Sequence, residues 1–223
     1  MKRLVIFDLD GTLLDTIGDL ARATNHALSA MGFKTHPLGV YPMLVGNGVT
    51  KLIERALPEE ERSEATIEAM HRHFTEYYGE HCADTTRPYP GIEQLLADLT
   101  AEGISVAVAS NKYQEATAKL VSTFFPDVPW VAVEGHREGV PTKPDPSIVF
   151  EILADHPTPK AEVLYVGDSG VDMDTAFRAC VESCGVTWGF RSREELERHH
   201  ADHIVSDTTA IMRIALGNVS RIH

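Results

Sequence analysis

Six short, predominantly apolar runs recur along the chain, and most of them are separated by residues with helical spacing. The runs lie at residues 4–7, 104–109, 130–133, 163–166, 185–188 and 203–205. Runs of this length without regular polar alternation are typical of strands buried on both faces of a parallel sheet. Strands that alternate with helices predict an α/β fold, in which right-handed helical crossovers connect parallel strands.

One long segment interrupts this alternation. From about Asp15 to Cys82 the sequence contains helical patterns and no convincing strand. Apolar residues follow helical spacing in three stretches, at residues 20–31, 48–57 and 64–81, and Gly32 is a predicted helix C-cap. Three helices are too many for one crossover. We therefore predict an inserted helical cap at residues 16–83 and a parallel-sheet core made of residues 1–15 and 84–223.

The charge balance and the cysteine content narrow the class of protein. The chain has 20 Lys and Arg residues against 33 Asp and Glu residues, a net charge of −13, which disfavours nucleic acid and anionic membranes as partners. No apolar run approaches the roughly 18 residues of a membrane span. Asp8 and Asp10 interrupt the first apolar run too early for a signal peptide. Three cysteines form no disulfide framework, and we expect a cytoplasmic enzyme.

The first predicted strand runs directly into two aspartates. In Phe7-Asp8-Leu9-Asp10-Gly11-Thr12-Leu13 the carboxylates of Asp8 and Asp10 share one face if the chain is extended. Open α/β sheets bind ligands at the carboxyl ends of their strands, where this pair lies. Gly11 allows a tight turn and a close approach of the backbone to a ligand. A single acidic residue here is explained equally well as a helix cap, whereas the pair favours a functional site.

A second acidic pair follows another predicted strand. Asp168 and Asp172 lie in Val166-Gly167-Asp168-Ser169-Gly170-Val171-Asp172. If the two strands are neighbours, Asp8, Asp10 and Asp168 converge. Two like charges about 4 Å apart repel by roughly 4 kcal/mol at an effective dielectric constant of about 20, so the cluster requires a cation or a proton. Oxygen ligands that also hold a phosphate are typical of Mg²⁺.

Two further segments carry groups that suit a phosphate. Ser110-Asn111-Lys112 follows the apolar run 104–109 and predicts a hydroxyl and backbone amides at a helix start, although an ordinary N-cap explains it equally well in isolation. Lys143 precedes Asp145 and Pro146, which we expect at the N-cap and the first position of the next helix. Lys143 then lies outside that helix and is free to reach inward, although an isolated lysine is usually solvated.

In order and content these elements resemble the motifs of the haloacid-dehalogenase-type phosphohydrolase superfamily, over nearly the whole chain. Residues 8–12 resemble its first motif, Ser110 its second, Lys143 its third, and Asp168 with Asp172 its fourth. The resemblance implies a Rossmann-like catalytic core with a helical cap. The dehalogenases of the superfamily lack the equivalent of Asp10, so its presence favours phosphoryl transfer.

The same resemblance implies a role for each site residue. Asp8 is the expected nucleophile, and Asp10 the expected general acid and then base. The expected Mg²⁺ ligands are the Asp8 carboxylate, the Asp10 backbone carbonyl and Asp168, with Asp172 in support. The expected phosphate- or substrate-binding residues of the core are Gly11, Thr12, Ser110, Asn111 and Lys143.

Several cap and core segments closely resemble bacterial phosphoglycolate phosphatases. They are Val45-Gly46-Asn47-Gly48-Val49 and residues 51–57, 87–91 and 185–190. Gly46 and Gly48 allow backbone amides to close over a small anion, and Asn47 and Lys51 are candidate donors for a carboxylate. A glycine-rich turn between two cap helices explains Asn47 and Lys51 equally well. Cys180 stands where relatives usually have a glycine at a helix end, which leaves the geometry of that end open.

The first hypothesis is therefore a Mg²⁺-dependent phosphatase that hydrolyses 2-phosphoglycolate through a phosphoaspartate on Asp8. The alternatives are the same chemistry on pyrophosphate, a sugar phosphate or a nucleotide, a β-phosphoglucomutase-like phosphotransferase, and a non-catalytic binding module. The expected partner is a small phosphorylated metabolite, and the expected assembly is a monomer or a weak homodimer. The histidines at 71, 73, 199, 200 and 203 lack a well-placed third metal ligand and are expected on polar surfaces.

Overall fold

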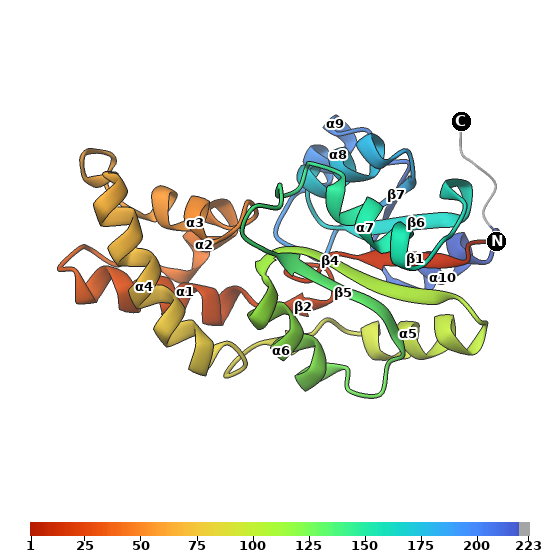
Figure 1. Cartoon of the computed structure of the whole chain (residues 1–223), viewed down its shortest axis with the longest axis horizontal. Helices are drawn as coiled ribbons and strands as arrows, with labels where there is room; N and C mark the ends of the chain where they lie inside the picture. The colour runs from red at the N-terminus through yellow and green to blue at the C-terminus, as the bar shows by residue number, and fades with distance from the viewer. Residues whose placement is uncertain (219–223) are drawn as a thin grey trace.

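A six-stranded parallel sheet forms the centre of the computed structural model, which describes residues 1–218 (Figure 1). Its strand order is β5-β4-β1-β6-β7-β8, and every neighbouring pair is parallel. The strands are β1 (Leu4–Phe7), β4 (Ser105–Tyr113), β5 (Trp130–His136), β6 (Val163–Gly167), β7 (Glu182–Val186) and β8 (His203–Val205). The predicted α/β class is confirmed, and β1 lies between β4 and β6 as the convergence of the aspartates requires.

Helices cover both faces of this sheet, which explains why its strands are apolar throughout. Val5 and Phe7 point into one core cluster, and Leu4 and Ile6 into the other. The first cluster includes α5 (Ile92–Ala101), α6 (Gln114–Phe124) and α10 (Thr208–Ala215). The second includes α7 (Ser147–Asp155) and α8 (Gly170–Ala179), and Figure 1 shows α5 and α7 on opposite sides of β1. A short helix, α9 (Arg193–Arg198), follows β7.

A separate lobe of helices lies beside the sheet (Figure 1). It contains α1 (Ile17–Ala30), α2 (Tyr41–Leu44), α3 (Val49–Ala56) and α4 (Glu64–His81), and its interior includes the fully buried rings of Tyr41 and Tyr78. The three helices predicted here are confirmed. The four-residue α2 and the 3-10 turns at Leu38–Val40 and Glu59–Glu61 are too short for their periodicity to be recognised. The domain limits at 15/16 and 83/84 stay a prediction.

The chain enters and leaves this lobe through two adjacent segments. β2 (Leu14–Asp15) and β3 (Arg87–Pro88) form a two-residue antiparallel pair. Next to it, the Asp19 side chain accepts hydrogen bonds from the backbone N–H and the hydroxyl of both Thr85 and Thr86, at 2.5 to 3.1 Å. One buried carboxylate therefore joins the start of α1 to the segment that returns to the sheet.

Three predicted boundaries were wrong by a few residues. β7 begins at Glu182 and ends at Val186, not at 185–188, because its polar first residues pair through the backbone with β6, which periodicity does not reveal. β4 continues to Tyr113, so Ser110-Asn111-Lys112 lies in the strand and α6 starts only at Gln114. α7 starts at Ser147, one residue after Pro146, and the Asp145 carboxylate accepts a hydrogen bond from the Ser147 N–H.

Cys180 ends α8 in the backbone conformation that glycine usually adopts at a helix C-terminus. Its backbone is left-handed, with φ 57° and ψ 43°. The Val181 N–H donates to the Ala176 carbonyl and the Cys180 N–H to the Phe177 carbonyl, both at 3.0 Å. These are the two hydrogen bonds of a Schellman motif. The helix end is therefore conventional in geometry, and only its residue type is unusual.

Replacing Cys180 with glycine is expected to stabilise the protein by about 1 kcal/mol. A left-handed backbone costs an L-residue roughly 1–2 kcal/mol, and part of that gain is offset by the entropy of glycine in the unfolded chain. Urea denaturation measures the change. Cys180→Ala is the matched control, since it removes the thiol but keeps the Cβ, and we expect it to leave the free energy of unfolding nearly unchanged. An equal gain in both variants would assign the effect to the thiol.

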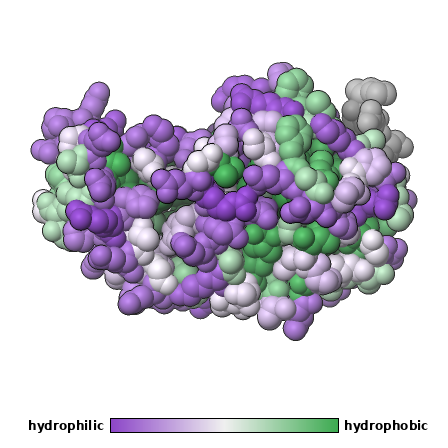
Figure 2. All heavy atoms as spheres, in the orientation of Figure 1, coloured by the Kyte–Doolittle hydropathy of each residue, from purple (hydrophilic) through white to green (hydrophobic). Residues whose placement is uncertain are grey.

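The outer surface is mainly hydrophilic, with an indentation between the two lobes on the upper edge of the view (Figure 2). Exposed apolar side chains include Met43 on α2 and Phe177 on α8. Within residues 1–218, no helix has both the length and the apolar character needed to cross a membrane.

Candidate active site

Asp8 and Asp10 lie at the carboxyl end of β1, in a tight loop. The Asp8 N–H donates to the Val166 carbonyl at 2.9 Å, which extends the pairing of β1 with β6 into the loop. Gly11 has φ +86°, and a Cβ at this position would lie 2.4 Å from the Asp168 Oδ2 atom. A glycine is needed here both for the left-handed backbone and for the close approach to Asp168.

Three buried carboxylates and one buried lysine meet beneath this loop. Oxygen atoms of Asp8, Asp168 and Asp172 lie within 4.8 Å of one another. The Lys143 Nζ atom lies 2.9 Å from the Asp8 Oδ1 and 2.7 Å from the Asp172 Oδ1, and it donates to the Ala109 carbonyl at 3.0 Å. The structure thus brings together Asp8, Asp168, Asp172 and Lys143, which come from three different parts of the sequence.

The two oxygens of Asp172 are both occupied by protein groups. Oδ1 contacts Lys143, and Oδ2 accepts hydrogen bonds from the Ser169 N–H at 3.1 Å and the Ser169 hydroxyl at 2.6 Å. The bond from the Ser169 N–H belongs to the capping box of α8. Asp172 is therefore placed to orient Lys143, and the support of Mg²⁺ binding predicted for it stays a prediction.

The charges of this cluster do not balance. Burial, together with the charges of Asp172 and Asp10, raises the pKa of Asp8 to about 7 despite the opposing effect of Lys143. Burial and the neighbouring Asp172 and Asp8 charges raise the pKa of Asp168 well above its usual range. Burial opposes the charge on Lys143, but Asp172 and Asp8 raise its pKa well above the ordinary value. One lysine for three carboxylates leaves an excess of negative charge on oxygen atoms only, which suits a hard divalent cation.

The segment after the apolar part of β4 supplies two buried polar side chains. Ser110 is buried, and its hydroxyl accepts a hydrogen bond from the Lys112 N–H at 3.2 Å. The Asn111 amide binds the backbone of Lys143 twice, donating to its carbonyl at 3.1 Å and accepting from its N–H at 2.8 Å. Asn111 thus holds the loop that carries Lys143. The phosphate contacts predicted for Ser110 and Asn111 stay predictions.

A cavity of about 700 Å³, part of which is open solvent, lies between this edge of the sheet and the helical lobe. From the sheet side it is lined by residues that include Asp8, Asp10, Ser110, Asn111, Lys143 and Asp168. From the lobe it is lined by Leu20, Val45, Gly46, Gly48, Val49, Leu52, Phe74 and Tyr78. The left-handed Gly46 and Gly48, with φ +126° and +82°, therefore bring the loop before α3 over the carboxylates.

Comparison with known proteins decides the family. The family model of the haloacid dehalogenase-like hydrolases matches residues 5–186 of the sequence, a range that includes most of β1, the whole helical lobe and β7. The chain belongs to the haloacid dehalogenase-like hydrolases.

Relatives within this family match over both the sheet and the helical lobe. A phosphoglycolate phosphatase of Agrobacterium fabrum is 32% identical over 213 residues, covering 95% of this chain and 91% of that protein. A phosphoglycolate phosphatase of Mesorhizobium japonicum is 31% identical over 198 residues, covering 88% and 87%. A crystal structure from Lactobacillus delbrueckii subsp. bulgaricus superposes with a TM-score of 0.91 at 31% identity, covering 97% of this chain and 100% of that one.

Two cationic residues of this haloacid dehalogenase-like hydrolase line the cavity but were not among the predicted site residues. The Lys112 Nζ atom lies 3.1 Å from the Asp10 Oδ2 and donates to the Tyr78 hydroxyl at 2.9 Å. The Arg191 guanidinium donates to the Pro42 and Val45 carbonyls of the lobe. Lys112 directly follows two predicted site residues, which is the signal that could have identified it. Arg191 has no such signal, because its contacts are about 150 residues away.

Other predicted residues lie beside the cavity. The Asn47 side chain accepts a hydrogen bond from Arg55 at 2.6 Å within the lobe, and Lys51 is half exposed and pairs with Glu54. Thr12 is fully buried, and its carbonyl accepts a hydrogen bond from the Trp188 indole at 3.1 Å. Asn47 and Thr12 are absent from the cavity lining, so their predicted substrate contacts stay predictions.

The His199 and His203 side chains of this family member have separate carboxylate partners. His199 ends α9 and lies 2.9 Å from the Asp174 carboxylate, whereas His203 belongs to β8 and lies 2.7 Å from Glu182. They therefore do not share the helix face that an i, i+4 metal pair requires. The potential metal group among the described residues is Asp8, Asp168 and Asp172.

Proposed function

We propose that this haloacid dehalogenase-like hydrolase is a Mg²⁺-dependent phosphatase whose substrate is 2-phosphoglycolate. In this proposal Asp8 takes the phosphoryl group, Asp10 exchanges protons with the leaving oxygen and with water, and residues 16–83 act as the cap that closes the cavity. The products are glycolate and inorganic phosphate.

The observation that carries the proposal is the division of the two Asp10 oxygens. Oδ2 is held by Lys112 at 3.1 Å. Oδ1 is buried and has no hydrogen-bond partner among the described residues. Asp10 lines the same cavity as Asp8, and we propose that its carboxyl group turns this unpartnered oxygen toward the ester oxygen that leaves the phosphorus attacked by Asp8. A proton donor near the leaving oxygen distinguishes ester hydrolysis from simple phosphate binding.

In the first step a carboxylate oxygen of Asp8 attacks phosphorus and the ester P–O bond breaks. Asp10 gives its proton to the departing alkoxide of glycolate, and Asp8 is left as an acyl phosphate. Lys143, held by Asp172, stabilises the negative charge on the phosphoryl oxygens. The Ser110 hydroxyl is a further donor to the same group.

In the second step Asp10, now ionised, takes a proton from water. The water oxygen attacks phosphorus, the bond to Asp8 breaks, and inorganic phosphate leaves with Asp8 restored. A carboxylate nucleophile divides one very slow displacement into two faster ones. Apolar groups of the lobe, including Phe74 and Leu52, line the cavity and limit the water that reaches the acyl phosphate.

The residues present fit the cation that such chemistry requires. The Asp8 and Asp168 carboxylates and the Asp10 carbonyl are proposed to hold Mg²⁺, supported by Asp172. When bound, Mg²⁺ supplies positive charge that offsets the repulsion between the phosphate and the carboxylates.

The choice of 2-phosphoglycolate rests on the relatives and on the cavity. The Agrobacterium fabrum and Mesorhizobium japonicum relatives are phosphoglycolate phosphatases. The lobe contributes mainly apolar side chains to the cavity, with Tyr78 as its one polar side chain. Such a wall offers few hydrogen bonds to the hydroxyls of a sugar or to a nucleotide base, which favours a small substrate.

The proposal is tested by phosphate release from a panel of esters with Mg²⁺ and then with EDTA. The panel contains 2-phosphoglycolate, pyrophosphate, β-glucose 1-phosphate and AMP, each also assayed with the Asp8→Asn variant to detect contaminating phosphatases. We expect the highest kcat/KM for 2-phosphoglycolate and a loss of about 100-fold or more with EDTA. Faster turnover of another ester would overturn the substrate. Phosphorylated enzyme without phosphate release would favour the phosphotransferase alternative.

A further inference from the structure

We infer that Lys112 is the specificity residue that binds an anionic group on the leaving part of the substrate, which for the proposed substrate is the glycolate carboxylate. The inference rests on the proposed function. It adds to that function by naming one side chain of β4 as the group that binds the substrate carboxylate.

Three cationic side chains line the cavity: Lys112, Lys143 and Arg191. Lys143 is engaged by Asp8, Asp172 and the Ala109 carbonyl. The Arg191 guanidinium donates to two carbonyls of the lobe and lies 3.5 Å from Glu195. These contacts hold Lys143 next to Asp8, where the phosphoryl group is proposed to bind, and they hold Arg191 against the helical lobe.

Lys112 differs from Lys143 because its ammonium group has a donor to spare, and from Arg191 because it contacts Asp10. Its side chain is 4% exposed, and within residues 1–218 its partners are one carboxylate oxygen of Asp10 and the Tyr78 hydroxyl. A lysine ammonium has three N–H donors. One donor therefore remains for a ligand, on a cation that is largely shielded from water, where a charge-assisted hydrogen bond is strong.

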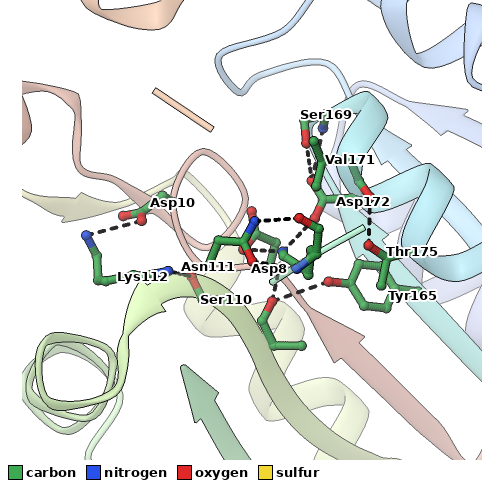
Figure 3. Close-up of polar contacts among 12 residues, drawn as sticks. Asp8, Asp10, Ser110, Asn111, Lys112, Tyr165, Ser169, Val171, Asp172 and Thr175 are labelled. Atoms are coloured by element: carbon green, nitrogen blue, oxygen red, sulfur yellow. Dashed lines mark hydrogen bonds and ion pairs between the residues drawn. The ribbon is translucent and has the colours of Figure 1, made fainter. Parts of the chain in front are cut away.

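The position of Lys112 matches the leaving part of the substrate. In Figure 3, Asp10 and Lys112 lie on one side of Asp8, and Asp172 and Tyr165 on the other. Lys143, the proposed ligand of the phosphoryl oxygens, bridges Asp8 and Asp172. We therefore place the phosphoryl group on the side of Asp8 that faces Asp172. Asp10 is the proposed proton donor to the ester oxygen, so a cation bound to Asp10 lies next to the atoms that depart.

The surroundings of Lys112 also limit the size of the group it binds. Tyr78 comes from α4 of the lobe, and the Lys112 ammonium lies 4.6 Å from the centre of its ring. Phe74, one turn earlier on α4, is buried and also lines the cavity. An anion bound to Lys112 is thus enclosed by apolar and aromatic side chains, which suits a compact carboxylate better than a hydroxylated ring.

The test compares two esters with the same two-carbon skeleton, 2-phosphoglycolate and 2-hydroxyethyl phosphate. The second replaces the carboxylate with a neutral hydroxymethyl group. In Lys112→Met we expect kcat/KM to fall for both esters, because Asp10 loses its partner, but to fall about 100-fold more for 2-phosphoglycolate. Inhibition by inorganic phosphate is expected to stay close to wild type, which reports an intact fold and phosphoryl side.

Two further variants sharpen the test. Lys51→Met makes the same substitution at a half-exposed lysine of the lobe that pairs with Glu54, and we expect it to leave the preference between the two esters unchanged. Tyr78→Phe removes one partner of Lys112 while keeping the aromatic ring, and we expect a smaller loss of preference. This second effect remains measurable even if Lys112→Met does not fold.

The outcomes separate the inference from the proposed function. If the wild-type enzyme prefers 2-phosphoglycolate and both Lys112→Met and Tyr78→Phe retain that preference, Lys112 does not bind the carboxylate and the inference is wrong. A loss of preference in Lys51→Met instead would assign the carboxylate to the lobe and also overturn it. Failure of the wild-type enzyme to hydrolyse 2-phosphoglycolate would overturn the proposed function itself.

Discussion

Replacing Asp8 with asparagine is expected to lower kcat/KM for 2-phosphoglycolate by at least about 10⁴-fold, as is typical when a covalent nucleophile is lost. The amide oxygen is a poor nucleophile, and no phosphoaspartate forms. Asp10 and Lys143 stay in place but have no acyl phosphate to act on. The measurement is phosphate release in the presence of Mg²⁺, together with trapping of the phosphorylated enzyme, which should be absent in the variant.

The same substitution is expected to leave the fold intact. Burial, together with the charges of Asp172 and Asp10, raises the pKa of Asp8 to about 7 and so disfavours its charged form. A neutral amide of the same shape is therefore tolerated at this position. Lys143 also keeps its contact with Asp172 at 2.7 Å. Asp15→Asn is the matched control, because Asp15 is an exposed residue of the adjoining β2, and it should retain wild-type turnover. Near-normal activity in Asp8→Asn would assign the nucleophile to another residue.

The second large effect is expected on stability, from Asp19→Ala. This buried carboxylate accepts hydrogen bonds from two N–H groups and two hydroxyls of Thr85 and Thr86. The alanine variant leaves these donors without their partner, and Thr86 is fully buried. We expect a loss of about 4 kcal/mol in the free energy of unfolding. Urea denaturation at neutral pH measures it.

A nearby surface aspartate provides the control for this measurement. Asp84 lies close to the same segment, but its side chain is 43% exposed and its partners are Arg22 and His81 on the surface. Asp84→Ala is expected to cost less than about 0.5 kcal/mol. Equal losses in the two variants would mean that the joint between the segments depends on surface charge and not on the buried hydrogen bonds.

The pH dependence of the Asp19 effect has a definite sign. Burial acts to raise the pKa of Asp19, but the hydrogen bonds from Thr85 and Thr86 outweigh it, and the pKa is lowered in the folded protein. A carboxyl whose pKa is lower in the folded state stabilises the protein above its unfolded pKa of about 3.9 and loses this effect as the pH falls. The difference between wild type and Asp19→Ala should therefore shrink below about pH 4.

Most of the sheet was predictable because its strands are buried on both faces. This burial requires apolar residues at every position, which makes the runs at Leu4–Phe7 and Val163–Gly167 visible without any knowledge of their neighbours. The start of β7 was missed for the opposite reason. Glu182 is polar, and it belongs to the strand through its backbone pairing with Leu164 of β6, which is distant in the sequence.

The chemistry at the strand ends was likewise readable from short segments. Asp8 and Asp10 directly follow β1, and Asp168 follows a strand that pairs directly with β1. Parallel-sheet topology requires Asp8 and Asp168 to meet, whereas the Asp10 carboxylate pairs with Lys112 and lies outside the group formed by Asp8, Asp168 and Asp172. The residue types and their spacing therefore predict the acidic cluster, and with it the need for a cation.

Only the tertiary structure decided which side chains meet across long separations. Lys112 contacts Tyr78 of the lobe, 34 residues earlier, Arg191 contacts Pro42 across 149 residues, and Asp19 binds Thr85 across 66. Each contact joins the helical lobe to the sheet or to the segment that returns to it, and no local periodicity encodes such a junction. The physical reason is that burial and backbone spacing act on neighbouring residues, whereas the partner of a buried charge is chosen by how the two lobes pack.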